Sequence, residues 1–408
     1  MKKTLFIISI LIAAAACKGV EGNPYDGHLN TLAVSAVYPD GFESFARSGV
    51  QVAVEDVNLG NRYVLPTDGA GKASFELVDG LYRVTVSDRC GEDIFNGTTD
   101  KFPVSGYGTL ELSVPLMHSK SGSIVVKEIY CGGCKKLPQE GDYQADQYVI
   151  LHNNDVDVQY LDSLCFGTLY PYNSNATNPF VTKDSVTGEN VYTDYLPIAQ
   201  AVWRFGGDGT TFPLAPGEDA VLVLRGAVDH TLQYPLSVNL NRPGYFVCYN
   251  NTYFTNTTFH PAPGDQIAGD HILDVVIKTG RANAYTFSVN SPTVLLFRAK
   301  DMTIEDFVKM EGSVLQVPGI PSDQVVAVPQ DWVVDAVEVF NGSSSSNAKR
   351  LVPSLDAGYV LQSDTFLGHT LMRKTDEALS ASSGYEVLED TNNSSSDFYE
   401  RETQSLHE

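Results

Sequence analysis

Hydrophobic and polar residues alternate along residues 29–117. Residues 50–54 and 110–116 each place an apolar side chain at every second position. A period of two is that of a β-strand with one buried face. Turn-forming pairs such as Asp68-Gly69 separate the strand-like runs. Short strands with turns at this spacing predict a small antiparallel sandwich.

Short apolar runs rich in β-branched residues predict a second, larger β-domain. The runs occupy residues 124–130, 147–152, 220–225, 293–298 and 333–340. Thr303, three positions before Asp306, is placed to cap one short helix. Loop-forming residues dominate 170–219 and 241–270, and 226–290 allows no strand assignment. We therefore predict an all-β chain of two Ig-like β-sandwich domains in tandem, the second enlarged by long loop insertions.

The N-terminus follows a different pattern. Lys2 and Lys3 precede an apolar run at 5–12, and three alanines lead to Cys17. A basic start, a short apolar run and small residues before a cut are typical of a secretory signal peptide. The run is shorter than the roughly 20 apolar residues of a spanning helix. Cys17 directly after the alanines resembles a bacterial lipobox, which implies acylation of its thiol; the alternative is an ordinary signal peptide that contains a cysteine.

The predicted organisation therefore has five parts. They are a lipoprotein signal peptide (1–16), a tether (17–28), a first β-sandwich (29–117), a second β-sandwich with insertions (122–398) and an acidic tail (399–408). The expected location is extracytoplasmic, with lipid anchoring to the outer membrane of a bacterium. The sequence leaves open whether the protein faces the periplasm or the cell surface.

The amino-acid composition argues against some classes of function. The 408 residues include 27 basic and 50 acidic side chains, giving a formal net charge of −23. Nucleic acid is not an expected partner, because phosphate-binding proteins need a positive surface. Motifs for zinc proteases, serine hydrolases and phosphate loops are missing from the sequence. The pairs Asp229-His230 and Asp270-His271 are only weak signals of a metal site, so we predict no bound metal. Because the catalytic motifs are missing, we also predict no cofactor, no catalytic residues and no enzymatic activity.

Aromatic residues in the 241–260 loop are the candidate binding residues. They are Tyr245, Tyr249, Tyr253 and Phe254. Exposed rings on long loops stack on sugars or anchor a protein partner. The alternative is that these rings cover the faces of the sandwich.

Five cysteines remain after Cys17, an odd number. Cys131 and Cys134 are separated by two glycines, and Pro138 and Gly141 argue against the helix that a redox motif would need. A zinc site needs four ligands, and the sequence offers few further ligands that could complete a site with these two cysteines. In an oxidising compartment we predict a local disulfide between Cys131 and Cys134.

Two family resemblances extend this picture. Gly49-Val50-Gln51-Val52, Thr67-Asp68-x-x-Gly71-x-Ala73-x-Phe75 and Gly80-x-Tyr82-x-Val84-x-Val86 resemble prealbumin-like, carboxypeptidase-regulatory-type domains of secreted bacterial proteins. In those families the module is mostly a spacer, so the resemblance implies a stalk.

The second domain resembles lamin-tail-type Ig-like domains. The matching stretches are 124–130, 146–154, 160–162, 213–218, 221–223, 335–338, 373–374 and 390–398. The whole region is most similar to gut-commensal bacterial lipoproteins of unknown function that enlarge this domain with insertions.

These observations predict a lipid-anchored extracytoplasmic binding or scaffold protein, whose first sandwich presents the larger domain. One alternative is an accessory lipoprotein of a nutrient-uptake system, which docks on an outer-membrane receptor and captures a glycan or peptide. Another is a hydrolase with an unrecognised site. An aromatic groove would favour ligand capture, a flat apolar patch a protein partner, and converging His and carboxylate side chains an enzyme.

Overall fold

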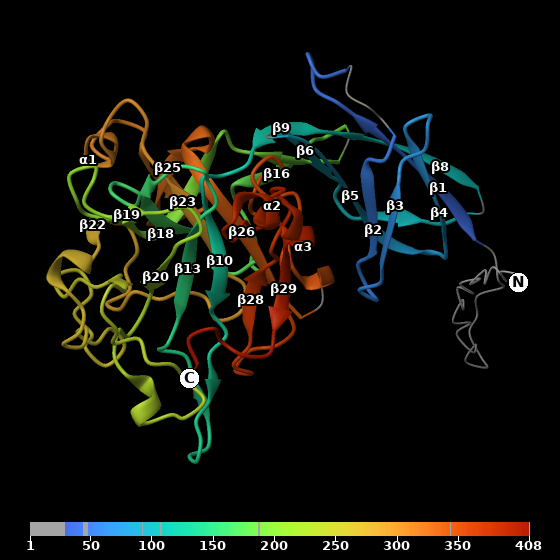
Figure 1. Ribbon diagram of the computed structural model, residues 1–408. Coiled ribbons are helices and arrows are strands. Elements are labelled where there is room, and N and C mark those ends of the chain that lie inside the picture. Colours follow the sequence, from blue (N-terminus) through green and yellow to red (C-terminus); the bar gives the residue numbers. More distant parts are fainter. Residues whose placement is uncertain are drawn as a thin grey trace, which may run out of the picture.

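The computed structural model describes residues 29–43, 48–91, 93–106, 108–186, 188–342 and 344–407. Two β-domains lie next to each other, the first in blue to teal and the second in teal to red (Figure 1). Strands predominate in both, and the helices are short. The prediction of an all-β sandwich fold is confirmed. Residues 1–28, with the predicted signal peptide and tether, lie outside the described part of the chain.

The first domain packs two sheets face to face. Its strands are β1 (Asn30–Val37), β2 (Gln51–Asp56), β3 (Arg62–Pro66), β4 (Lys72–Leu77), β5 (Gly80–Cys90), β6 (Asp93–Thr98), β7 (Phe102–Val104), β8 (Thr109–Pro115) and β9 (Met117–Lys120). One sheet has the order β4-β1-β8, and the other β3-β2-β5-β6-β9, with β7 also paired to β5. Val52, Phe75 and Val84 belong to the core between them. The period-two pattern at 50–54 thus marks a buried face, as predicted.

The structure revises two details of the first domain. The β1–β8 pair is parallel, so the sandwich is not wholly antiparallel. The domain also continues beyond residue 117, because β9 forms an antiparallel pair with β6. Residues 121–123 then lead directly into the first strand of the second domain.

The second domain contains two large sheets and three small two-stranded ones. Its strands are β10 (Ile124–Tyr130), β11 (Cys134–Lys135), β12 (Asp142–Tyr143), β13 (Tyr148–Asn153), β14 (Gln159–Tyr160), β15 (Cys165–Leu169), β16 (Val181–Lys183), β17 (Asn190–Tyr192), β18 (Tyr195–Arg204), β19 (Pro213–Leu214), β20 (Asp219–Val223), β21 (Phe246–Val247), β22 (Asp274–Lys278), β23 (Thr293–Phe297), β24 (Val314–Val317), β25 (Ile320–Pro329), β26 (Val333–Asn341), β27 (Val360–Gln362), β28 (Thr370–Arg373) and β29 (Phe398–Arg401). The large sheets have the orders β21-β20-β13-β10-β28-β29 and β24-β25-β18-β15-β23-β26-β27, with β22 paired to β18.

The core of this domain lies between its two large sheets. Trp203, Leu222 and Val294 are among its fully buried side chains. The helices are α1 (Ile304–Phe307), α2 (Glu377–Ser383), α3 (Ser394–Asp397) and the 3-10 helices η1 (His230–Leu232), η2 (Gly269–His271), η3 (Gln330–Trp332) and η4 (Ser344–Ser346). The Thr303 side chain accepts a hydrogen bond from the Asp306 backbone N–H, so the predicted cap of α1 is confirmed.

Part of the predicted loop at 170–219 is a central strand. β18 pairs with β15, β22 and β25 in the larger sheet. Most of its side chains are buried on both faces, so it lacks the alternation that identifies a half-exposed strand. Gln200 interrupts it with a φ of 64°, which further hides the pattern.

The predicted acidic tail, 399–408, is instead part of the second domain. Its first residues belong to β29, which pairs with β28. Gln404 is buried, and the Ser405 backbone N–H donates to Glu128 Oε1 at 3.1 Å. The charged composition suggested a solvated tail, but strand pairing and these contacts hold the segment against the sheet.

Candidate functional site

The two domains are joined by side-chain hydrogen bonds. Asn96 on β6 donates to the carbonyl oxygens of Thr391, at 2.6 Å, and Asn392, at 3.1 Å. In the reverse direction, Asn392 donates to Ser119 Oγ at 2.9 Å. Asn393 donates to Ser87 Oγ at 2.7 Å. Loop 391–393 of the second domain therefore contacts the six-stranded sheet of the first, and we call these contacts the interdomain joint.

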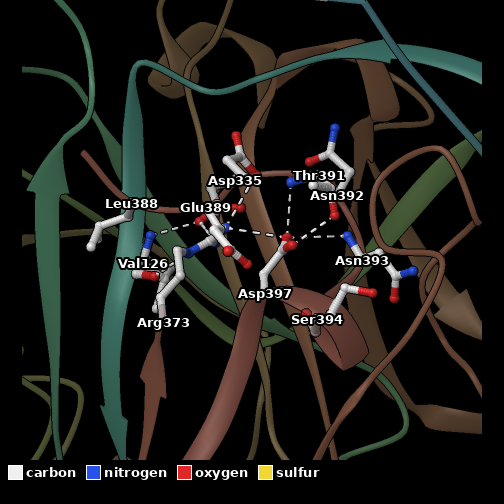
Figure 2. Close-up of polar contacts among 12 residues, drawn as sticks. Val126, Asp335, Arg373, Leu388, Glu389, Thr391, Asn392, Asn393, Ser394 and Asp397 are labelled. Atoms are coloured by element: carbon white, nitrogen blue, oxygen red, sulfur yellow. Dashed lines mark hydrogen bonds and ion pairs between the residues drawn. The ribbon is translucent and has the colours of Figure 1, made fainter. Parts of the chain in front are cut away.

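A buried ionic cluster holds this loop in place (Figure 2). Asp397 accepts hydrogen bonds from the Thr391 backbone N–H at 2.9 Å and from its hydroxyl at 2.6 Å. Arg373 contacts three carboxylates, Asp335 at 2.6 Å, Asp390 at 3.1 Å and Asp397 at 3.7 Å. All four side chains are almost wholly buried, so a single cation faces three acids without solvent.

Burial dominates the electrostatics of this cluster. It raises the pKa of Asp397 to about 7, although Arg373 acts in the opposite direction, and nearby Asp390 adds to the rise. Burial likewise raises the pKa of Asp335 to about 6. The cluster therefore retains protons close to neutral pH. Because it has no access to solvent, we assign it to the interdomain joint rather than to chemistry on a ligand.

Beside the joint, a cleft of about 740 Å³ separates the domains. Its first wall is formed by Arg83 on β5, by residues 98–101 at the end of β6 and in the loop after it, and by Pro115 and Met117. The β16–β17 hairpin and residues 348–353 form the opposite wall. Pockets of roughly 300–1,000 Å³ bind small molecules in proteins, often at domain interfaces. We take this interdomain cleft as the candidate functional site.

Cations line the inner part of the cleft. The Arg83 side chain is 6% exposed, with Nη1 3.6 Å from Glu55 Oε2. Among the described residues, Nη1 has no hydrogen-bond partner. The guanidinium lies 5.9 Å from the ring centroid of Phe340 and 5.6 Å from that of Tyr359. Arg83 is therefore a buried cation whose ion pair is long and incompletely hydrogen-bonded.

Two lysines accompany Arg83. Lys101 Nζ donates to the carbonyl oxygens of Ser345, at 2.7 Å, and Asn347, at 3.2 Å. Lys349 is buried and donates to a backbone carbonyl of its own domain. Burial lowers the pKa of both lysines, and the positive charge of Arg83 lowers them further. Glu55 opposes this fall in pKa at Lys101, and Asp356 and Glu338 oppose it at Lys349, without cancelling it.

The aromatic residues predicted to bind do not form one site. Phe254 is 1% exposed and stacks on Trp203 in the inter-sheet core, at 5.7 Å between centroids. The expectation of an exposed ring is wrong for Phe254, because the loop folds back over the core. Tyr245 and Tyr249 pack partly buried against a separate apolar cluster, and Tyr253 is 46% exposed.

The predicted disulfide is also wrong, because Cys131 and Cys134 are both free thiols. Cys131 Sγ lies 3.2 Å from Gln362 Oε1, whereas Cys134 Sγ lies 3.7 Å from Asp146 Oδ2. Cys131 joins the inter-sheet core, and Cys134 opens β11, so the side chains enter different surroundings. Burial raises the pKa of each thiol to about 12. Cys17 lies outside the described residues.

The weak metal signals do not converge. His230 contacts the Tyr143 hydroxyl at 2.7 Å and the Gly226 carbonyl at 2.5 Å. Within the described ranges, no three His, Cys, Asp or Glu side chains gather in a way that could hold a metal ion. Nor does that part of the chain contain a helix long and apolar enough to cross a membrane.

Sequence reasoning missed the cleft because its walls come from distant segments. Arg83 occupies an outward position of an alternating strand, where a charged side chain is ordinarily solvated. Its burial depends on contact with the second domain, through Phe340 and Tyr359. No local pattern at residues 81–86 could have indicated that contact.

Comparisons with known proteins place the chain near one family. Residues 215–405 match the family model described as protein of unknown function, DUF4876. No curated protein matches the chain. The fimbrial anchor protein Mfa2 from Porphyromonas gingivalis aligns over 48% of this chain and 78% of its own, with 10% identity. Its TM-score of 0.18 carries no structural argument.

A second solved structure is much more similar. It is the crystal structure of a DUF4876 family protein from Bacteroides thetaiotaomicron, 26% identical, with a TM-score of 0.57. The alignment covers 90% of this chain and 94% of that one. The expected similarity to a gut-commensal family of unknown function is consistent with these matches, whereas the lipoprotein and lamin-tail-type assignments stay predictions. Residues 215–405 thus match the DUF4876 family model, and the chain is similar to a DUF4876 protein over most of its length.

Proposed function

We propose that this protein is a lipid-anchored, extracytoplasmic binding protein of a bacterial outer membrane. In this proposal the first domain is a rigid spacer, and the ligand binds in the interdomain cleft. The observation that carries the proposal is that both domains line this cleft, while the joint beside it holds them together. A plain scaffold would not need cations buried at such a cleft.

The position of β1 supports the role of spacer. β1 belongs to the β4-β1-β8 sheet, which lies on the side of the first domain away from the second (Figure 1). The hydrogen bonds of the joint come from the other sheet, through Ser87, Asn96 and Ser119. An acyl anchor at Cys17 would therefore leave the second domain on the far side of the first.

The joint also supports a rigid unit. Three residues, 121–123, connect β9 to β10. Further contacts fasten the domains away from this link. Arg62 donates to the Ser395 carbonyl at 3.1 Å, and the Tyr359 hydroxyl donates to Glu55. A short connection with several polar contacts on both sides favours one fixed orientation, which a preformed binding cleft requires.

Membrane partition tests the anchored role. Acylation needs the thiol of Cys17, so Cys17→Ser should abolish partition into the detergent phase, whereas the matched Cys90→Ser should retain it. Equal membrane retention of the Cys17→Ser and unsubstituted chains would overturn the proposal of a lipid anchor.

A further inference from the structure

We infer that the interdomain cleft binds a saccharide carrying acidic groups, with Arg83 as the anion-binding residue. This inference rests on the proposed function and specifies the ligand class. It follows from the arrangement of charge, polar groups and apolar surface in the cleft.

Arg83 is the first reason. A buried guanidinium requires partners, because removal of a charge from water is costly. Charge-assisted hydrogen bonds of this type measure about 2.7–2.9 Å, whereas Nη1 is 3.6 Å from Glu55 Oε2. Glu55 also accepts a hydrogen bond from Tyr359, which divides its charge between two donors. Arg83 lines the cleft, and its planar guanidinium matches the carboxylate or sulfate groups of an acidic ligand.

The distribution of charge is the second reason. Arg83 and Lys349 are buried among the lining residues, whereas the acids Glu189 and Asp194 are exposed. Asp100, also at the cleft, is engaged in an ion pair with Lys183. Glu55 lies beside Arg83, and Asp356 and Glu338 act on Lys349, but none of these three acids lines the cleft. The buried charges of the lining are therefore cations, in a chain of net charge −23. Nearby positive charges and low exposure strengthen the attraction for an anion.

The neutral lining favours a saccharide over a bare ion. Thr99, Asn190 and Gln330 place polar groups on the walls, and Met117 and Val352 add apolar surface. Hydroxyl-bearing rings need both, because their edges form hydrogen bonds and their faces contact apolar atoms. The cleft of about 740 Å³ is also far larger than a sulfate or phosphate ion requires.

Titration calorimetry on the full chain in detergent tests the inference, with trigalacturonate as the acidic probe. Neutral galactotriose and inorganic sulfate are the comparison ligands. We expect trigalacturonate to bind, galactotriose not to bind at millimolar concentration, and sulfate to bind much more weakly than trigalacturonate. Arg83→Met should weaken trigalacturonate binding about 10- to 100-fold, because a hydrogen bond to a charged group is lost. Added salt should weaken it further.

Lys101→Met is the second variant, and it keeps the test valid if Arg83→Met unfolds. Lys101 is more accessible than Arg83, and its replacement should also reduce affinity for trigalacturonate. Lys72→Met is the matched control, because it removes the same charge from an exposed site paired with Glu111. It should leave affinity unchanged.

Three results would overturn the inference: no binding of trigalacturonate, equal affinity for galactotriose, or equal losses in Lys72→Met and Lys101→Met. Sulfate binding as tightly as trigalacturonate would overturn the saccharide and leave an anion site. None of these outcomes alters the membrane partition of Cys17→Ser, so a wrong ligand is distinguishable from a wrong anchored role.

Discussion

Asp397→Asn should remove a pH-dependent part of the stability of the interdomain joint. Burial raises the pKa of Asp397 to about 7 in the folded protein, above its ordinary value of 3.8. A raised folded-state pKa means that the folded chain holds the proton more tightly than the unfolded chain. The resulting stabilisation is complete below pH 3.8 and is lost as the pH rises through 7.

The magnitude follows from linkage. Between pH 6 and pH 8, a group with a folded pKa near 7 and an unfolded pKa near 4 loses about 1 kcal/mol of stabilisation. Asparagine cannot titrate, yet its side-chain oxygen still accepts the Thr391 backbone N–H. The free energy of unfolding of the unsubstituted chain, minus that of Asp397→Asn, should therefore fall by about 1 kcal/mol from pH 6 to pH 8.

Urea denaturation at several pH values measures this difference. The difference between the two chains is needed because two histidines contribute to stability with the opposite pH dependence. Burial lowers the pKa of His260 to about 4 and also lowers that of His230, so their contributions increase as the pH rises. Both histidines are unchanged in Asp397→Asn and cancel. A difference that rises with pH would refute the reasoning, because it would mean that attraction to Arg373 outweighs burial.

Three further outcomes are expected. Arg373→Met should lower the free energy of unfolding by about 3–5 kcal/mol in urea, because it leaves buried carboxylates without their cation; a loss below about 1 kcal/mol would contradict the buried cluster. Phe254→Ala should cost about 3–5 kcal/mol, whereas Tyr253→Ala, at a half-exposed neighbour, should change thermal stability little; similar losses for both would show that Phe254 is not a core residue. Mass spectrometry of unreduced peptides should find Cys131 and Cys134 unlinked and alkylated only after unfolding, and a Cys131–Cys134 link would restore the disulfide.

The sequence predicts strands well where apolar residues alternate with polar ones or form a β-branched run. Residues 50–54 alternate on β2, and the apolar run at 124–130 matches β10 residue for residue, although β10 is buried on both faces. β18 is also buried on both faces, but it escaped prediction because Pro197 and Gln200 break its apolar run. The segment after 398 escaped because charge content does not reveal strand pairing.

The candidate site could not be predicted from local sequence patterns, because it depends on contacts between different segments. The aromatic residues of the 241–260 loop indicated a binding site there. The position of Phe254 is instead decided by its contact with Trp203, about 50 residues away in the sequence. The CxxC spacing indicated a disulfide, yet the two thiols contact different partners, Gln362 for Cys131 and Asp146 for Cys134. Arg83 becomes a binding candidate only when a second domain covers it. Most of these contacts join segments that are far apart in the sequence.

Hydrogen–deuterium exchange of the full chain with and without trigalacturonate tests the central claim, that both domains build one binding cleft. The account predicts simultaneous protection on both walls, in β5 and residues 98–101 of the first domain and in β16, β17 and residues 348–353 of the second. Protection confined to the 241–260 loop, or to one domain, would contradict it.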